Sequence, residues 1–460
     1  MQIIQIYNKF KECGSVTTDT RTLKGGEMFF ALKGENFDGN EYALKALEAG
    51  ARYAVVDAGS EVGRTCTDER LIVVEDTLKT LQELARWHRS MTFVDGKPIP
   101  VIALTGTNGK TTTKELIRQV LSVKYRVVAT EGNLNNSIGV PLTLLRIGPD
   151  TEIAVVEMGA SHPGDIKELV EIALPNYGLI TNVGKAHLLG FGSFEGVMQT
   201  KGELYDYLRR TADKVFLNAD NPYLCRMAAE RQLMSDPERP YSLVVPYGLR
   251  YSGASVLPSS PEHPFLRIVV PSLESLGQDS GAYAVVETNL VGSYNADNVM
   301  AAIGVGGYFG VSFKEAAEAI SSYVPSNNRS QMTRTERNIL IVDAYNANPT
   351  SMAAALENFS GVESDSKVAM LGDMLELGAE SVTEHRTVVE SALSRGFSRV
   401  FFVGDEFRKA ASGMQMPENV SFFDSSESLA GYLANAGISD SVILIKGSRG
   451  IRMEKVIPML

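Results

Sequence analysis

The segment Thr105-Gly-Thr-Asn-Gly-Lys-Thr111 has the residue types and spacing of a phosphate-binding loop. An apolar run over 99–104 precedes it and a helix-like apolar spacing over 116–121 follows it, so the sequence predicts strand, loop and helix in that order. Glycines let backbone amides turn towards an anion, the helix start adds unpaired amides, and Lys110 adds a positive charge. The Thr111 hydroxyl suits Mg2+. We therefore expect this loop to hold a nucleoside triphosphate with its metal.

The loop departs from the usual pattern at one position, because Leu104 stands where such loops have their first glycine. The alternative is a glycine-rich turn that only joins a strand to a helix. Gly-Lys-Thr-Thr after a buried strand combines an anion site, a cation and a metal-binding hydroxyl, which favours the phosphate loop. The residues that we expect to contact the nucleotide here are Gly106, Thr107, Asn108, Gly109, Lys110, Thr111 and Thr112.

Further chemical groups follow other predicted strands. Glu157 ends an apolar run at 152–157, where a carboxylate can hold Mg2+ opposite the phosphate loop; a solvated strand-end glutamate is the alternative. His187 follows the run at 178–183 and is a candidate metal or substrate ligand, although a lone histidine is more often structural. Lys201 has the position of an ordinary lysine at the start of a helix, so its spacing alone does not single it out.

Polar loops cluster in two other parts of the chain. The segments 343–351, 371–378 and 446–449 each follow a predicted strand, and three such loops at one sheet edge favour a binding site over unrelated turns. The asparagines of 133–141 can orient a polar substrate or cap a helix, and capping is the commoner use. Near the N-terminus, 15–21 and 33–40 carry hydroxyls, glycines and basic residues that can bind a phosphate or sugar or form turns.

These groups must be positioned by three α/β units with different patterns. Residues 1–90 predict a small α/β domain with strands at 28–32, 53–56 and 71–74 and helices at 42–49 and 78–88, and 91–100 is predicted to be a linker. Residues 98–325 predict a central ATP-binding domain whose parallel sheet carries attached antiparallel strands near 266–270 and 283–287. Residues 326–460 predict a Rossmann-like domain without a dinucleotide glycine fingerprint, so no nicotinamide cofactor is expected.

Composition excludes several classes of protein. The 460 residues include 44 basic and 55 acidic side chains, a net charge of -11, which argues against a nucleic-acid binder. The three cysteines are widely spaced and form neither a disulfide framework nor a zinc cluster. No apolar stretch approaches 18 residues, and no basic segment with a long apolar run begins the chain. We expect a cytoplasmic protein without membrane insertion.

Taken together, these motifs resemble those of the Mur ligase family, over nearly the whole chain from about residue 15 to 449. The phosphate loop is similar to the family's ATP loop. The other matching residues, in the order that the family has them, are Asn135-Asn136, Glu157-Met-Gly159, Asn182 to His187, Lys201-Gly-Glu203, Asn295 to Asn298, Arg329 and Asp343. Segments 343–351 and 371–378 resemble those of the family member that joins D-alanyl-D-alanine to UDP-N-acetylmuramoyl-tripeptide.

The resemblance implies an ATP- and Mg2+-dependent ligase of three domains, which acts on these two small molecules. We also expect a monomer that binds no nucleic acid. In the family, ATP phosphorylates the carboxylate of the UDP-linked peptide, and the incoming amine attacks the acyl phosphate. By resemblance, Thr111, Glu157, His187 and a carbamylated Lys201 hold Mg2+, and Lys110 meets the phosphates. Asn295, Arg329 and Asp343 would contact the nucleotide. The substrate contacts implied are Ser15, Thr18, Asp19, Arg21, Lys33, Gly34, Asn135, Asn136, Tyr345, Asn346 and Asn348.

Two positions depart from the family pattern. Asn40 stands where the family often has histidine, and Tyr294 precedes Asn295 where histidine is usual. Two other functions remain open from the sequence: a Mur ligase that adds a single amino acid, and a nucleotide-binding module that does not turn over. Glu157, His187 and Lys201 together argue against the second, because a simple binder needs no second metal site.

Overall fold

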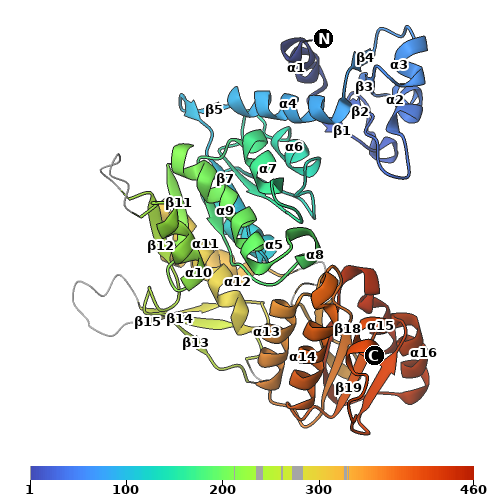
Figure 1. Ribbon diagram of the computed structural model, residues 1–460. Helices are drawn as coiled ribbons and strands as arrows, with labels where there is room; N and C mark the ends of the chain where they lie inside the picture. Colours follow the sequence, from blue (N-terminus) through green and yellow to red (C-terminus); the bar gives the residue numbers. More distant parts are fainter. Residues whose placement is uncertain are drawn as a thin grey trace, which may run out of the picture.

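The computed structural model describes residues 2–211, 213–234, 242–260, 263–271, 283–325, 329 and 331–460. The chain forms three α/β units, and Figure 1 shows the N-terminal unit in blue and the C-terminal unit in red on either side of the central one. This confirms the predicted fold class. No described helix combines the length and apolar character that a membrane span would need.

The N-terminal unit is a parallel sheet in the order β1-β2-β3-β4. Its three longer strands and helices α2 and α4 lie where the sequence predicts them. Helix α1 was not predicted; it buries Ile6 and Phe10 against α4. The elements are α1 (Ile3–Cys13), β1 (Val16–Thr17), η1 (Thr20–Thr22), β2 (Met28–Phe30), η2 (Gly39–Tyr42), α2 (Ala43–Glu48), β3 (Tyr53–Asp57), α3 (Glu61–Thr65), β4 (Leu71–Val74) and α4 (Thr77–Ser90).

The segment 91–100, predicted to be a linker, forms a short hairpin instead. Strands β5 (Phe93–Val94) and β6 (Lys97–Pro98) pair antiparallel around Asp95 and Gly96. Both turn residues have positive φ, 49° and 75°, which is the backbone that a two-residue Asp-Gly turn requires. The Asp-Gly pair was therefore a hairpin signal in the sequence.

The central unit is a parallel sheet in the order β12-β11-β10-β7-β9-β8. Strand β7, which leads into the phosphate loop, lies inside the sheet and is buried throughout. The predicted antiparallel strands are present as the separate sheet β13-β14-β15. The strands are β7 (Val101–Thr105), β8 (Val127–Ala129), β9 (Ile153–Glu157), β10 (Tyr177–Ile180), β11 (Lys214–Asn218), β12 (Val244–Tyr247), β13 (Ser255–Leu257), β14 (Arg267–Pro271) and β15 (Tyr283–Glu287).

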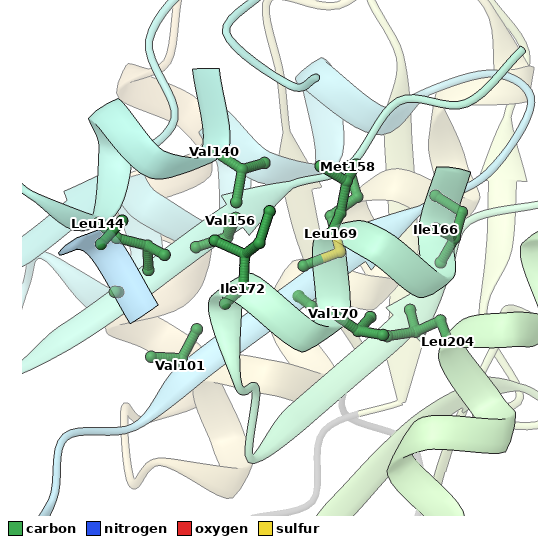
Figure 2. Close-up of a cluster of buried hydrophobic side chains, with 14 of the residues drawn as sticks. Val101, Val140, Leu144, Val156, Met158, Ile166, Leu169, Val170, Ile172 and Leu204 are labelled. Carbon is green, nitrogen blue, oxygen red and sulfur yellow. The ribbon is translucent and has the colours of Figure 1, made fainter. Parts of the chain in front are cut away.

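Helices cover both faces of this sheet. On one face, Val101 and Val156 pack against side chains of α6, α7 and α9, as Figure 2 shows. On the other face, α5 and α11 pack against Leu104 and Val155. The helices are α5 (Lys110–Leu121), α6 (Gly139–Leu144), α7 (Asp165–Ala173), α8 (Leu188–Phe191), α9 (Phe194–Thr211), α10 (Pro222–Glu230), η4 (Ser293–Asn295), α11 (Ala296–Tyr308) and α12 (Phe313–Ser322).

The C-terminal unit has the strand order β16-β17-β21-β18-β19-β20, with β16 antiparallel to β17 and the others parallel. Strands β16 and β20, at the two edges, were not predicted. The elements are β16 (Gln331–Arg334), β17 (Asn338–Asp343), α13 (Pro349–Ser360), β18 (Lys367–Gly372), η5 (Gly378–Glu380), α14 (Ser381–Leu393), β19 (Arg399–Val403), α15 (Asp405–Ala410), β20 (Val420–Phe423), α16 (Ser426–Ala436), β21 (Ser441–Lys446), η6 (Arg449–Ile451) and η7 (Met453–Met459).

We predict that Leu144→Ala destabilises the protein by about 2–5 kcal/mol, because Leu144, the last residue of α6, is fully buried and its truncation leaves a cavity. Urea unfolding followed by the fluorescence of Trp87, on the neighbouring helix α4, measures the change. The matched control is Leu44→Ala, a leucine that is 44% exposed, with an expected change within about 0.5 kcal/mol. Equal midpoints for the two variants would contradict the assignment of this core.

Candidate active site

The phosphate loop turns sharply between β7 and α5. Gly106 and Gly109 have φ of +146° and +77°, which L side chains rarely adopt. A Cβ at Gly106 would lie 2.1 Å from Thr181 Oγ1, and one at Gly109 would lie 2.5 Å from Asn298 Oδ1. Helix α5 begins at Lys110, so its unpaired amides face the loop. The glycines are therefore required both by backbone conformation and by space.

Neighbouring segments fix the loop. The Asn108 backbone N–H donates to Asn182 Oδ1 at 2.9 Å, and Thr181 Oγ1 donates to the Asn108 carbonyl at 2.7 Å. Asn348, from the C-terminal unit, donates from Nδ2 to Asn108 Oδ1 at 2.8 Å while its own Oδ1 caps α13. The loop is thus held from the end of β10 and from the start of α13.

Lys110 lies over the loop that it follows. Its Nζ donates to the carbonyls of Gly106 and Thr107 at 2.8 and 3.1 Å. Burial lowers the pKa of Lys110; Glu157 acts in the opposite direction and Arg329 adds to the lowering. An anion in the loop would offset both the burial and the neighbouring positive charge.

The carboxylate of Glu157, 1% exposed, lies beside the start of α5. It accepts hydrogen bonds from Thr111 Oγ1 at 2.9 and 3.1 Å and from Asn135 Nδ2 at 2.8 Å. Hydroxyl and carboxylate oxygens are the protein ligands that suit Mg2+, which usually keeps waters and substrate phosphates as its other ligands. Within the described ranges, no group of three or more His, Cys, Asp or Glu is arranged to hold a metal. The Thr111 and Glu157 oxygens therefore fit Mg2+ that arrives with a nucleotide.

His187 and Lys201 lie on the side of α8 and α9. His187 Nδ1 contacts the Glu376 carboxylate of the C-terminal unit. Burial lowers the pKa of His187 below its usual value, with Glu376 opposing this. Lys201 is 2% exposed, and its Nζ lies 3.5 Å from the Ala160 carbonyl oxygen. Burial lowers the pKa of Lys201 well below that of a free lysine, and the charge of Lys110 adds to the effect, while Asp165 and Glu203 oppose it.

A cavity of about 930 Å³ lies between the central and C-terminal units. It brings together many of the residues singled out in the sequence. Lys201, Gly106 and Asn348 lie next to it without lining it. The sequence-predicted residues that line it are Thr107, Asn108, Gly109, Lys110, Thr111, Thr112, Asn135, Asn136, Glu157, His187, Asn295, Arg329, Asp343, Tyr345 and Asn346.

The C-terminal wall of the cavity carries charge and an aromatic ring. Lys446, whose side chain is 1% exposed, forms an ion pair with Asp343 and donates to the Asn346 carbonyl at 3.3 Å. The Arg329 guanidinium lies 3.5 Å from the centroid of the Tyr345 ring. Lys446 was not a candidate by itself, although its position at the end of β21 gave the same strand-end signal as its neighbours.

The cavity also includes a loop that sequence reasoning missed. Asp220, Asn221 and Tyr223 line it directly after β11. The apolar residues of 214–218 predict a strand, and the rule that polar residues after a parallel strand mark a site would have found this loop. Asn136, in contrast, uses its Oδ1 to accept from the amides of Ile138 and Gly139, which is the capping role left open in the sequence.

Asn295 is buried where α11 begins. Its Nδ2 donates to the Val291 carbonyl at 2.9 Å, and its Oδ1 accepts from Asn298 Nδ2 at 2.9 Å. Asn298 Oδ1 in turn accepts from Thr113 Oγ1 at 2.9 Å. This chain of side-chain amides connects α11 to α5, the helix that follows the phosphate loop.

The N-terminal candidates lie apart from the cavity. None of Ser15, Thr18, Asp19, Arg21, Lys33 and Gly34 is among the residues that line it. Arg21 Nη2 lies 2.6 Å from Asp19 Oδ2, and the hydrogen bonds from Arg21 lower the pKa of Asp19 to about 2. Lys33 Nζ lies 3.4 Å from Asp38 and 3.9 Å from Asp57. These contacts are compatible with either a ligand site or a surface turn.

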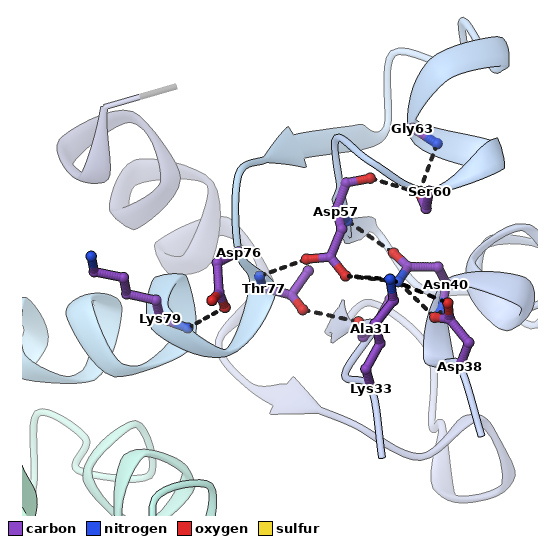
Figure 3. A network of polar contacts seen from close by, with 10 residues as sticks. All are labelled: Ala31, Lys33, Asp38, Asn40, Asp57, Ser60, Gly63, Asp76, Thr77 and Lys79. Atoms are coloured by element: carbon purple, nitrogen blue, oxygen red, sulfur yellow. Dashed lines mark hydrogen bonds and ion pairs between the residues drawn. The ribbon is translucent and has the colours of Figure 1, made fainter. Parts of the chain in front are cut away.

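Asn40, the position where the family often has histidine, is buried in a polar network (Figure 3). Its Nδ2 donates to Asp38 and Asp57 at 2.7 and 2.8 Å, and its Oδ1 accepts from the Asp57 backbone N–H at 2.9 Å. Asp57 also accepts from the Thr77 backbone N–H at 2.8 Å, where α4 begins. Asn40 therefore stabilises the loop that carries Lys33 and connects it to β3 and α4.

Comparisons with known proteins agree with this geometry. Family models match in three segments: "Mur ligase family, catalytic domain" at residues 12–89, "Mur ligase middle domain" at 104–306 and "Mur ligase, glutamate ligase domain" at 328–449. A relative from Bacillus subtilis (strain 168) is 33% identical over 96% of this chain and 92% of its own length. One from Escherichia coli (strain K12) is 33% identical over 97% and 93%. Both are named UDP-N-acetylmuramoyl-tripeptide--D-alanyl-D-alanine ligase.

Solved structures show the same three-domain architecture. MurF from Acinetobacter baumannii superposes with a TM-score of 0.81 at 24% identity, over 99% of this chain and 98% of its own. MurF ligase from Thermotoga maritima in complex with ADP gives 0.79 at 26% identity, over 97% and 96%. Sequence identity, family models and architecture agree over almost the entire length, and this chain belongs to the Mur ligase family.

Proposed function

We propose that this protein is the ATP-dependent ligase that adds D-alanyl-D-alanine to UDP-N-acetylmuramoyl-tripeptide in the synthesis of peptidoglycan precursors. The observation that carries the proposal is the shared cavity, in which a phosphate loop faces the polar loop that follows β17. The two relatives described above, similar over nearly their full length, carry the name of this activity.

ATP with Mg2+ supplies a phosphoryl group that converts the peptide carboxylate into an acyl phosphate, which an amine can attack with release of phosphate. The loop amides and Lys110 bind and orient the phosphates, and Thr111 and Glu157 hold the metal. Asn295 would contact adenine, while Arg329 and Asp343 would lie near the ribose and phosphates. Because the transfer needs positioning and charge neutralisation more than a covalent catalyst, these fixed groups supply most of what the reaction requires.

Lys201 and His187 would serve a second Mg2+. A protonated lysine cannot ligate a cation, but a neutral buried amine can react with CO2 to give a carbamate, whose oxygens are anionic ligands. The low pKa of Lys201 supports this role. Burial lowers the pKa of His187, which favours the neutral imidazole with a nitrogen lone pair.

We assign the dipeptide to the C-terminal domain and the UDP end of the other substrate to the N-terminal domain. Tyr345 and Asn346 would line the dipeptide side, with Asn348 next to them, and Asn135 and Asn136 would lie nearer the tripeptide. The N-terminal domain, placed at 1–90, would hold the UDP end through Ser15, Thr18, Asp19, Arg21, Lys33 and Gly34. The central domain is placed at 98–325 and the C-terminal domain at 326–460. We infer a monomer in the cytoplasm, where the nucleotide substrates are available.

We predict that phosphate release from ATP requires both the UDP-linked tripeptide and D-alanyl-D-alanine. Release should fall to background when either is omitted or when a single amino acid replaces the dipeptide. A coupled phosphate assay on the purified protein measures this. Release that is as fast with single D-alanine or L-lysine as with the dipeptide would instead identify a family member that adds one amino acid.

Lys110→Ala is expected to lower the rate of phosphate release by about 100-fold or more, because the charge that meets the transferring phosphoryl group is removed. The matched control is Lys45→Ala, an exposed lysine of α2, which should leave the rate unchanged. The same coupled assay compares the two proteins. Full activity of Lys110→Ala would refute the assignment of the phosphate loop.

Lys201 is expected to carry a carbamate at neutral pH, and to lose it as the pH falls and the amine becomes protonated. This direction follows from its lowered pKa, which leaves the amine free to react with CO2. Carbon NMR of protein equilibrated with 13C-bicarbonate should show a carbamate signal that Lys201→Ala lacks and Lys45→Ala retains. Identical spectra for wild type and Lys201→Ala would exclude the modification.

A further inference from the structure

The loop between β18 and η5, in the C-terminal unit, contacts helix α8. Glu376, in this loop, has a positive φ of 64° and directs its carboxylate to His187 Nδ1. The Glu376 carbonyl accepts from the Leu189 backbone N–H at 3.1 Å. A Cβ at Gly378 would lie 3.3 Å from Leu189 Cδ1, so the loop passes close to α8. One loop thus makes both a side-chain and a backbone contact with the segment that carries His187.

Buried polar groups hold this loop from within the C-terminal unit. Asp373, 4% exposed, accepts from the backbone amides of Glu406 and Phe407 at 3.0 Å, at the start of α15. His385, fully buried, accepts at Nε2 from the Met374 amide at 2.9 Å. Its Nδ1 donates to the Ser381 carbonyl at 2.7 Å.

A third anchor comes from the loop after β21. Ser448 Oγ accepts from the Leu375 amide at 3.0 Å, so three consecutive residues before Glu376 are each fixed by a buried partner. A loop pinned at three successive residues has little freedom to choose another path. The position of the Glu376 side chain therefore follows from the position of the C-terminal unit as a whole.

Contacts of Lys185 also join the central unit to the C-terminal unit at this place. Lys185, two residues before His187, forms an ion pair with Glu384 of α14, and its backbone N–H donates to Thr350 Oγ1 at 3.1 Å. The segment 185–189 is thus contacted by α13, by α14 and by the Glu376 loop. The C-terminal unit thus contacts both the ring of His187 and the segment around it, although His187 belongs to the central unit.

We propose that Glu376 is a positioning residue for His187. Its loop is held in place by Asp373 and His385. A neutral imidazole with a carboxylate at Nδ1 carries its proton on Nδ1, which leaves the lone pair on Nε2. Carboxylates that accept from the far nitrogen of a metal-binding histidine fix its tautomer and orientation in this way. The C-terminal unit, when it lies against α8, thereby sets His187 in the form that can bind a cation.

The tautomer in this proposal follows from geometry alone, whereas its use in metal binding rests on the proposed function. The side chain of Glu376 is 58% exposed, so its removal should barely alter folding. Its effect should appear in the state of His187 and in cation binding, which separates positioning from a purely structural role.

The test uses the full chain labelled with 15N-histidine, at about pH 8, where an imidazole is neutral. The signal of His187, one of five histidines, can be assigned by its absence from a His187→Ala spectrum. Long-range 15N–1H correlations should show His187 protonated at Nδ1 in the wild type, and shifted towards Nε2 protonation in Glu376→Ala. Glu390→Ala, an exposed glutamate of α14, is the matched control and should match the wild type. A His187 tautomer unchanged in Glu376→Ala would overturn the proposal.

A second measurement follows the consequence for cations. Titration of Mn2+ in the presence of ADP, followed by electron paramagnetic resonance, should show about tenfold weaker binding in Glu376→Ala than in Glu390→Ala. Equal affinities would overturn the link between the tautomer and the cation. Failure of the proposed ligase activity would appear separately, as absent dipeptide-dependent phosphate release in the wild type, and would leave the tautomer result standing.

The supporting residues can be tested in the same spectrum. His385→Leu removes the acceptor for the Met374 amide and should move the His187 tautomer, although His385 does not touch His187. His385→Gln retains an acceptor on a side chain of similar reach and should restore the wild-type signal. If both variants leave His187 as in the wild type, the loop is not held by His385. Glu376→Ala tests the proposal even if His385→Leu does not fold.

Discussion

A buried carboxylate needs hydrogen-bond donors in place of water. The donors that Glu157 finds hold together the segments that form the site. It is almost fully buried, and its oxygens are met by the Thr111 hydroxyl at the start of α5 and by the Asn135 amide before α6. Three segments that are distant in sequence are thereby held at one end of the central sheet. The same oxygens are those that suit Mg2+, so the contact that organises the protein also prepares the metal ligands.

This arrangement depends on a second constraint, the meeting of two units at the phosphate loop. Asn348 binds Asn108 and caps α13 with the same side chain, so the position of the loop is coupled to the position of a C-terminal helix. Gly184 shows how close the approach is, since a Cβ there would lie 2.7 Å from Thr350 Oγ1. Such a junction suits a reaction that must exclude water, because the groups of both units come together only when the units are in contact.

Much of this could be predicted from local sequence. The apolar run before Gly106 and the helix after Lys110 gave the phosphate loop, and a carboxylate at the end of a parallel strand gave Glu157. The edge strands β16 and β20 were missed because edge strands lack the continuous apolar run of a strand buried on both faces. Glu376 and Lys446 lie in the segments 371–378 and 446–449 that were predicted as polar loops, but their individual partners were not predicted. Their importance lies in contacts across long sequence separations, to His187 and Asp343, which no local pattern contains.

Lys201 illustrates the same limit in terms of charge. Its spacing in the sequence is that of an ordinary surface lysine, and only the folded chain shows it buried near the cation Lys110. Two amines that share a low-dielectric region cannot both keep their protons without cost, so one becomes neutral unless an anion intervenes. Lys110 has the phosphate loop beneath it, where a polyphosphate would offset its charge. Lys201 lies outside the cavity lining, and burial and the charge of Lys110 lower its pKa, while Asp165 and Glu203 oppose this. The fold thereby places the two lysines in different surroundings, with Lys110 over the phosphate loop and Lys201 buried outside the cavity lining.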